Sequence, residues 1–193
     1  DLVVQIGPGL GALTRALCQN AKKVIAIEAD PNMVGILRQT CASFKNLEII
    51  QQDALHFDWN NIASPYKIAA NLPYNIATHL IRQLLESKNR PAVLAVMVQK
   101  EVGERIVSRA PDANILSLSV QMYANTSLDM LVPRTAFYPE PNVDSAIVRI
   151  EPRLGAPNPE EAQKIFHLIK IGFASPRKKL SNNLSTGLKK EKS

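Results

Sequence analysis

Apolar positions in the first two-thirds of the chain alternate between short β-rich runs and stretches with helical spacing. The short runs predict strands at residues 2–6, 23–29, 46–54, 66–71 and 92–99. The stretches between them predict helices at about 12–21, from 31 onward, and at 77–86 and 100–108. This order is typical of an α/β protein, in which crossover helices connect the strands of one sheet.

The following part of the chain has a less regular pattern. Residues 115–124 favour a helix, because Ile115, Leu118 and Met122 are spaced by three and four positions. Residues 128–133 and 145–152 predict two late strands, with a proline-rich loop between them. These two strands could close the sheet as an antiparallel pair.

A domain boundary is predicted after Pro152. Residues 152–161 contain three prolines and one glycine, which is typical of a linker, and a helix is predicted at 160–174. We therefore divide the chain into a catalytic domain, 1–152, and the start of a helical domain, 153–193. Residues 175–193 cannot build a core alone, so they either pack on the main domain or begin a helical domain that is cut short.

The composition indicates a globular protein in a reducing compartment. Hydrophobic residues make up 46% and charged residues 21% of 193 residues. No apolar run approaches the roughly 20 residues needed to cross a bilayer, so a cytoplasmic location is expected. Cys18 and Cys41 lack the spacing of metal ligands and are expected to be buried free thiols. No catalytic role is assigned to any histidine.

Positive charge is concentrated at the end of the chain. From Lys164 onward there are eight Lys or Arg residues and one Glu, whereas residues 1–163 carry 15 basic and 16 acidic side chains. The whole excess of the +6 net charge therefore lies in the C-terminal segment. Such a segment favours a polyanionic partner, nucleic acid before membrane, although a solvated tail would show the same pattern.

Three strand ends carry residues suited to an adenosine-bearing cofactor. Gly7, Gly9 and Gly11 allow a sharp strand-to-helix turn and close approach of a ligand to the backbone. Glu28, at the end of the next strand, could accept hydrogen bonds from both ribose hydroxyls. Asp53, which is expected to close the third strand, could accept one from an adenine amino group. The G-x-G-x-G spacing differs from the G-x-G-x-x-G of dinucleotide-binding proteins.

The fourth predicted strand ends in Asn71-Leu72-Pro73-Tyr74. An exocyclic amine of a nucleobase is a poor nucleophile, because its lone pair is delocalised into the ring. The side-chain carbonyl of Asn71 and a main-chain carbonyl, of Leu72 or Pro73, could accept its two N–H groups. Pro73 restricts the turn, and Tyr74 offers a ring on which a flipped base could stack.

The proline-rich loop between the two late strands carries Phe137 and Tyr138. An aromatic ring on a rigid loop could stack on the other face of the base, opposite Tyr74. For Phe137, stacking and packing remain equally open. Tyr138 is expected to be a packing residue.

Together these motifs resemble the KsgA-type ribosomal RNA adenine dimethyltransferases. The matching segments are "GPGLGALT", "NLPYNI", "MVQKEVGERI", "VPRTAFYPEPNVDSAIVRI" and "GFASPRKKLSNNL", in this order along nearly the whole chain. The resemblance implies a Rossmann-like, class I methyltransferase sheet that uses S-adenosylmethionine. The given sequence departs from the family pattern in two ways: it has Gln5 where Glu is common, and it does not include the family's N-terminal Gln-x-Phe-Leu segment.

The resemblance also implies roles for residues on the cofactor side. The three glycines would approach the methionine and ribose part of S-adenosylmethionine. Glu28 would hold the ribose, and Asp53 with Ala54 would bind the cofactor adenine. Asn71 would border both the cofactor and the target.

By the same resemblance, Asn71, Leu72, Pro73 and Tyr74 hold the target amine, and Phe137 stacks on the target base. Arg177, Lys178 and Lys179 would bind RNA phosphates. The implied substrate is two adjacent adenosines in a hairpin near the 3′ end of small-subunit rRNA, each dimethylated on N6 in immature subunits. A monomer that needs no metal and no membrane is expected.

Two alternatives remain open. One is an enzyme that dimethylates an adenosine of large-subunit rRNA, a class that typically carries Ile in place of Leu72. The other is a non-catalytic ribosome-assembly factor or nucleic-acid-binding protein that has kept the fold.

Overall fold

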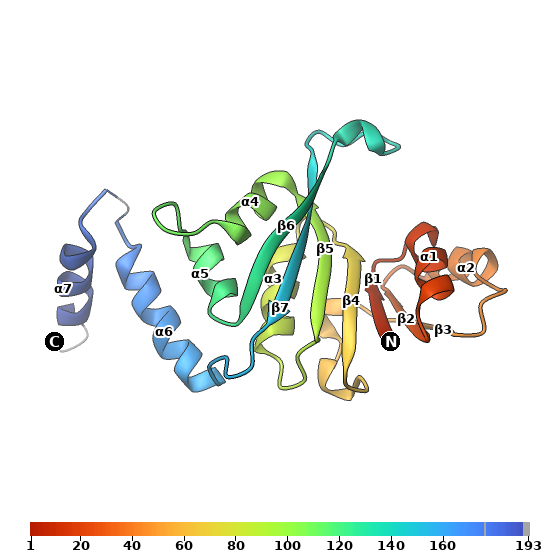
Figure 1. Cartoon of the computed structure of the whole chain (residues 1–193), viewed down its shortest axis with the longest axis horizontal. Coiled ribbons are helices and arrows are strands. Elements are labelled where there is room, and N and C mark those ends of the chain that lie inside the picture. The colour runs from red at the N-terminus through yellow and green to blue at the C-terminus, as the bar shows by residue number, and fades with distance from the viewer. Residues whose placement is uncertain (176, 191–193) are drawn as a thin grey trace.

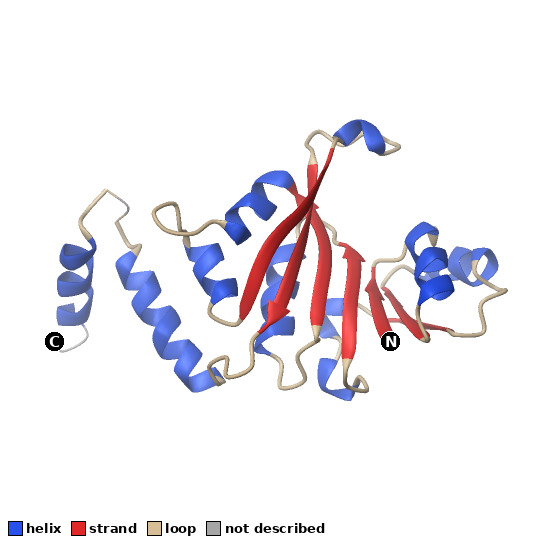
Figure 2. Cartoon of the chain, in the orientation of Figure 1, coloured by secondary structure: helices blue, strands red, loops and turns tan. Residues whose placement is uncertain are grey.

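The computed structural model describes residues 1–175 and 177–190, and it shows one twisted sheet with helices on both of its faces (Figures 1 and 2). The strands are β1 (Leu2–Ile6), β2 (Lys23–Glu28), β3 (Leu47–Gln51), β4 (Tyr66–Asn71), β5 (Val93–Gln99), β6 (Ala124–Val132) and β7 (Ser145–Pro152). The helices are α1 (Ala12–Asn20), α2 (Pro31–Thr40), α3 (Ala77–Glu86), α4 (Lys100–Val107), α5 (Ile115–Gln121), α6 (Pro159–Gly172) and α7 (Leu180–Lys190). Short 3₁₀ turns are η1 (Ala54–His56), η2 (Trp59–Asn61) and η3 (Arg134–Ala136).

The seven strands are ordered β3-β2-β1-β4-β5-β7-β6. Strands β1 to β5 are parallel, while β7 is antiparallel to both β5 and β6. The predicted α/β class and the antiparallel closing pair are therefore confirmed. The chain order reverses between β1 and β4, and the carboxyl ends of strands at such a switch point are where open α/β sheets bind ligands.

The main core lies on the sheet face covered by α3, α4 and α5. It contains the strand residues Val4, Ile68, Val96 and Val148 together with side chains of these helices, among them Leu80, Leu84, Ile106 and Val120. A smaller cluster of Ala26, Leu37 and Cys41 packs α2 against the opposite face near β2. On that opposite face Ala95 and Arg149 are exposed.

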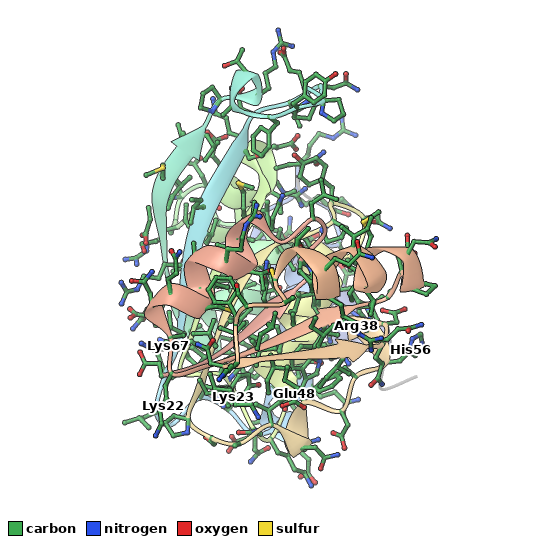
Figure 3. All side chains as sticks on the ribbon, turned by 90° about the vertical axis from the view of Figure 1, so that its right-hand side faces the viewer. Lys22, Lys23, Arg38, Glu48, His56 and Lys67 are labelled. Carbon is green, nitrogen blue, oxygen red and sulfur yellow. The ribbon has the colours of Figure 1, made fainter. Side chains whose placement is uncertain are left out.

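The edge of the sheet formed by β2 and β3 is polar. Lys23 of β2 lies beside Glu48 of β3, with 2.7 Å between Nζ and Oε2 (Figure 3). Both side chains are about half exposed, and ion pairs of this kind contribute little to stability. Substitution of Glu48 is therefore expected to change the stability of the fold little.

Two predicted strands differ from their observed bounds by more than one residue at an end. β3 ends at Gln51 instead of continuing to Ala54, because the side chain of Asp53 accepts a hydrogen bond from Leu55 N and starts the turn η1. β6 begins at Ala124, four residues before the predicted start, and shortens the predicted helix to Gln121. Pairing of its polar first half with Pro152 to Arg149 of β7 outweighs the low strand propensity of that segment.

The predicted linker is held against the preceding part of the chain. Arg153 N donates to Tyr123 O, and Arg90 donates from its guanidinium to Pro157 O at 3.0 Å. Asn158 caps α6 through a capping box with Glu161. α7 then packs on α6, where Asn183 Nδ2 donates to Gly172 O and Ser175 O.

The two cysteines are free and buried, as predicted. Burial raises the pKa of the Cys18 thiol, and the nearby Cys41 raises it further, so the neutral thiol is favoured. Within residues 1–175 and 177–190, no helix has the length and apolar character required to cross a membrane.

Candidate active site

The turn after β1 is built from three glycines in the left-handed backbone region. Gly7, Gly9 and Gly11 have φ of 64°, 54° and 87°, a range in which an L side chain is strained. The turn is fixed by hydrogen bonds from Gly7 N to Ile27 O and from Gly11 N to Pro8 O, each 3.0 Å long. The backbone is therefore held in a shape that requires glycine.

The surroundings of these glycines differ. A Cβ on Gly11 would lie 2.9 Å from Leu37 Cδ1 and 3.0 Å from Cys41 Sγ, so glycine there allows α1 to pack on α2. A Cβ on Gly9 would meet nothing within 4 Å. Gly9 thus borders open space at the carboxyl end of the sheet, where a ligand can approach the backbone.

Glu28 is tied to the same turn. Its Oε2 accepts from Gly9 N at 3.4 Å, and its Oε1 accepts from Asp30 N at 3.0 Å. These two backbone donors orient the carboxylate at the end of β2. A carboxylate oriented in this way can accept hydrogen bonds from vicinal hydroxyls without having to be ordered when the ligand binds.

Asp53 follows the end of β3 by two residues and caps η1. Its Oδ1 accepts from Leu55 N at 2.9 Å, and its Oδ2 lies 3.2 Å from Nδ1 of His56. Figure 3 shows His56 at the surface. Ala54, directly after Asp53, is buried. The second carboxylate is therefore also oriented before any ligand is present.

The fourth strand brings the second group of predicted residues to the glycine turn. A Cβ on Gly7 would lie 3.8 Å from Asn71 O and 3.9 Å from Pro73 Cδ, at ordinary van der Waals distance, so Gly7 faces both residues. β4 pairs directly with β1, and Ile6 is in register with Ala70. We call Gly7, Gly9, Gly11, Glu28, Asp53 and Ala54 the cofactor side, and Asn71, Leu72, Pro73, Tyr74 and Phe137 the target side.

Within the target side, Asn71 and Leu72 present different atoms. Asn71 is exposed at the last position of β4. The side chain of Leu72 is only 1% exposed and belongs to the core, and its N–H donates to Met97 O at 3.1 Å. Leu72 can therefore offer a ligand its main-chain carbonyl but not its side chain.

Pro73 and Tyr74 form the turn into α3. Pro73 O accepts from Ile76 N and Ala77 N, both at 3.1 Å, and so already has two donors. The Tyr74 ring is 39% exposed, and its hydroxyl lies 3.2 Å from Oγ of Ser145, the buried first residue of β7. This contact joins residues 71 positions apart and holds the ring at the carboxyl end of β4.

The loop between β6 and β7 lies at the same end of the molecule (Figure 1). Phe137 is partly buried at the end of η3. Tyr138, expected to be a packing residue, is instead 102% exposed, because the extended backbone at Phe137 directs neighbouring side chains to opposite sides. Among the described residues no ring contact between Phe137 and Tyr74 is present, so the stacking pair remains a prediction.

The predicted RNA-binding residues do not lie with the others. Arg177, Lys178 and Lys179 are exposed on the connection between α6 and α7. Figure 1 shows this connection well apart from the cofactor side, with α4, α5 and several strands between them. The last part of the basic segment, residues 191–193, lies outside the described residues.

Three residues near the site carry signals that sequence patterns did not provide. Ser145 holds Tyr74 and His56 contacts Asp53, and both contacts depend on the fold. Gln5 is 1% exposed on β1 next to the glycine turn, and its Oε1 has no hydrogen-bond partner among the described residues. A buried acceptor without a partner at this place could be satisfied by a bound polar group or by water.

The cofactor side fits an adenosine-bearing ligand. Gly9 leaves room at the backbone, Glu28 and Asp53 are oriented acceptors on successive strand ends, and Gln5 adds a buried acceptor under the turn. A ligand that carries two ribose hydroxyls, an adenine amine and a charged amino-acid group has donors for all of these.

Other concave surfaces lie outside this site. A cavity of about 430 Å³ between α3, α5 and α6 is lined by Arg82, Glu86, Phe166 and Lys170, among others. Both cations lie over the Phe166 ring, 4.7 and 4.8 Å from its centroid. The cavity contains none of the predicted site residues. Across the described part of the chain, no cluster of three or more His, Cys, Asp or Glu side chains could hold a metal.

The strand order, the glycine turn and the carboxylates at successive strand ends define a class I methyltransferase fold. Residues 1–193 match the family model described as "Ribosomal RNA adenine dimethylase", and the chain belongs to this family. The resemblance found in its motifs is thereby confirmed.

Relatives and solved structures agree with this assignment. The chain is 43% identical over 192 residues to "Ribosomal RNA small subunit methyltransferase A" of Dehalococcoides mccartyi, covering 97% of this chain and 66% of that protein. It is 42% identical to the protein of the same name from Levilactobacillus brevis, with 95% and 66% covered. The chain thus spans about two-thirds of the length of these relatives.

Among solved structures, a dimethyladenosine transferase from Plasmodium falciparum superimposes with a TM-score of 0.82 at 30% identity. The match covers 95% of this chain and 66% of that one. The 23S rRNA methyltransferase ErmE has the same TM-score at 23% identity, with 96% and 75% covered, and shows the shared fold alone.

Proposed function

We propose that the protein is an S-adenosylmethionine-dependent enzyme that dimethylates N6 of two adjacent adenosines in the 3′-terminal hairpin of small-subunit rRNA. The observation that carries this proposal is the position of Gly7, which faces Asn71 O and the Pro73 ring. It sets a cofactor-binding turn beside a group of hydrogen-bond acceptors suited to an adenine amine. The family and the names of the relatives support rRNA as the acceptor.

On the cofactor side, the chain positions the methyl donor. Glu28 accepts the ribose hydroxyls, Asp53 accepts the adenine amine, and the open backbone at Gly9 accommodates the amino-acid part. S-adenosylmethionine, when bound, supplies an electrophilic methyl group on a sulfonium. Gln5 offers hydrogen bonding close to that group without the negative charge that a Glu would add.

On the target side, the chain prepares the nucleophile. The amide oxygen of Asn71 and the carbonyl of Leu72 accept the two N–H groups of N6, because Pro73 O is already occupied by Ile76 N and Ala77 N. These acceptors favour a pyramidal nitrogen whose lone pair points at the methyl group. In-line attack by N6 would break the bond between the methyl carbon and sulfur, so that S-adenosylhomocysteine would leave as a neutral thioether, and the proton that N6 loses would pass to solvent.

Positioning and hydrogen bonding account for the catalysis in this scheme. Tyr74, held by Ser145, supplies a face for the flipped adenine, and Phe137 supplies the other. Because transfer occurs twice on each adenine, the target side also has to admit an N6 that already bears one methyl group. One N–H then remains for the second transfer, so only one of the two acceptors is used.

The C-terminal helices provide the proposed contact with RNA phosphates. Arg177, Lys178 and Lys179 are exposed together on the α6–α7 connection, away from the chemistry. Phosphate contacts position nucleic acid without reading its sequence. We accordingly propose residues 1–152 as the catalytic domain of a cytoplasmic monomer, and residues 153–193 as the start of an RNA-binding unit.

Transfer of a labelled methyl group by the full-length protein tests the proposal. Immature small subunits, large-subunit rRNA and DNA are offered as acceptors under equal conditions. Label in small-subunit rRNA alone supports the proposed function. Label in large-subunit rRNA, or binding to small subunits without any transfer, would replace it with one of the two alternatives.

A further inference from the structure

The loop between β6 and β7 projects beyond the rest of the molecule at the carboxyl end of the sheet, in both orientations shown (Figures 1 and 3). It is a stiff projection. Pro133, Pro139 and Pro141 restrict its backbone, and Arg134 N donates to Asp144 Oδ1 at 2.9 Å across its base. A side chain at its tip is therefore held in place at little further entropic cost.

Tyr138 is the most prominent side chain on this loop. It is 102% exposed, whereas its neighbour Phe137 is partly buried. The backbone at Phe137 is extended, with φ of −115° and ψ of 151°, so the two rings point to opposite sides. When Phe137 faces the target adenine, Tyr138 faces away from it, outside the catalytic pocket.

Three further apolar side chains in and beside this loop are exposed. Met130 and Leu131 near the end of β6 and Val143 on the return of the loop are also exposed. Charge contributes little here, because Arg134 is the only basic residue of the loop and it pairs with Glu140 at 3.0 Å.

Base flipping exposes RNA bases on which an aromatic ring at the tip of this loop could stack. Removing an adenine from its stack leaves the bases beside it without a neighbour on one face. An aromatic ring can replace the lost stacking partner, and proteins that bind unstacked RNA commonly use aromatic rings in this way. Such a contact tolerates any base and does not depend on a nearby phosphate charge.

We propose that Tyr138 stacks on an rRNA nucleotide next to the target adenosine, outside the catalytic pocket, and so positions the RNA for methyl transfer. This proposal rests on the proposed function. It makes Tyr138 a positioning residue for the acceptor, with no role in cofactor binding or in the chemical step.

The first test is steady-state methyl transfer by the full-length protein, with immature small subunits as the acceptor. Tyr138→Ala is expected to raise KM for the subunits about tenfold with kcat and cofactor affinity nearly unchanged. Tyr138→Phe keeps the ring and is expected to behave like the wild type. Leu154→Ala, at an equally exposed residue in the linker, is the matched control.

Salt separates stacking from charge in the same assay. The effect of Lys178→Ala on KM should shrink as salt is raised, because it arises from phosphate contacts. The effect of Tyr138→Ala should persist over the same range. A Tyr138 effect that disappears with salt, or one that Tyr138→Phe reproduces, would overturn the stacking proposal.

The second test locates the contact. The full-length protein carrying Tyr138→p-benzoylphenylalanine is irradiated on immature small subunits, and the crosslink is mapped. A crosslink to rRNA within a few nucleotides of the methylated adenosines supports the proposal. A crosslink to a ribosomal protein or to distant rRNA overturns it, while methyl transfer by the wild type in the same preparation shows that the proposed function still holds.

Discussion

The cofactor side and the target side of this site lie on neighbouring strands but are held in place differently. On the cofactor side, Glu28 and Asp53 accept hydrogen bonds from backbone N–H groups within their own turns or from the adjacent glycine turn. On the target side, Tyr74 is held by Ser145 from a distant strand, and Asn71 is exposed at the end of β4. Turns at and beside the carboxylates orient the cofactor side, whereas a contact between distant segments of the chain orients Tyr74 on the target side.

This difference has consequences for substitutions. Changes on the cofactor side should affect binding of the methyl donor or the stability of the fold. Changes on the target side should affect transfer while the donor still binds. The two sides meet where Gly7 faces Asn71 O and Pro73.

The largest expected effect is that of Asn71→Ala. Loss of an acceptor for the target amine should lower the rate of transfer about 100- to 1,000-fold, the usual size for a group that stabilises a transition state. Affinity for S-adenosylmethionine, measured by calorimetry, should be nearly unchanged. Asn125→Ala, at an exposed residue at the other end of the sheet, serves as the control. Equal loss of transfer and of cofactor binding would show that Asn71 is mainly structural.

Gly11→Ala should lower the free energy of unfolding by about 1–3 kcal/mol, because the new methyl group meets Leu37 and Cys41 at a φ of 87°. Gly35→Ala is a matched control with the opposite expected sign. Gly35 is inside α2 with nothing within 4 Å of an added Cβ, so the substitution should gain about 0.5–1 kcal/mol. Urea unfolding of both variants measures the difference. A Gly11 variant as stable as the wild type would refute the packing role.

Glu28→Gln should weaken binding of S-adenosylmethionine about tenfold, because hydrogen bonds to the ribose hydroxyls lose a charged acceptor. Transfer at saturating cofactor should recover most of its rate. Glu48→Gln, which removes the partner of Lys23 at the sheet edge, should leave cofactor affinity unchanged. If Glu28→Gln slowed transfer even at saturating cofactor, Glu28 would affect the transfer step as well as cofactor binding, which would contradict the account.

The smallest expected effect concerns the contact between Tyr74 and Ser145. Tyr74→Phe and Ser145→Ala should each lower stability by about 1 kcal/mol or less and slow transfer modestly. Because the two hydroxyls lie 3.2 Å apart, the double variant should lose less than the sum of the two single losses. Strictly additive losses in unfolding and in transfer would show that the contact does not hold the ring.

The local organisation of the cofactor side explains why sequence patterns predicted it. Glycine spacing after a strand, a carboxylate at the end of the next strand and an Asp in a turn are all features of short segments. The same segments placed the ends of β1 and β4 correctly and the end of β2 within one residue. Asp53 was assigned to the end of a strand although it caps a turn, because capping and strand-end patterns look alike in sequence.

The arrangement of the target side could not be predicted fully, because it depends on contacts between residues that are far apart in the sequence. Nothing local to Ser145 indicates that its hydroxyl holds Tyr74, 71 positions earlier. The exposure of Tyr138 was mispredicted, since an aromatic residue in a loop is more often packed, and only the extended backbone directs this one outward. Likewise, only the structure reveals that the side chain of Leu72 is buried, which leaves the main-chain carbonyl as the group this position can offer a ligand.

The most direct test of the account is mass spectrometry of the nucleosides in small-subunit rRNA after reaction with the full-length protein. The account predicts N6,N6-dimethyladenosine at two adjacent positions of the 3′-terminal hairpin, and its loss with Asn71→Ala. Small-subunit rRNA without dimethyladenosine, or with the same amount from the Asn71→Ala protein, would contradict it.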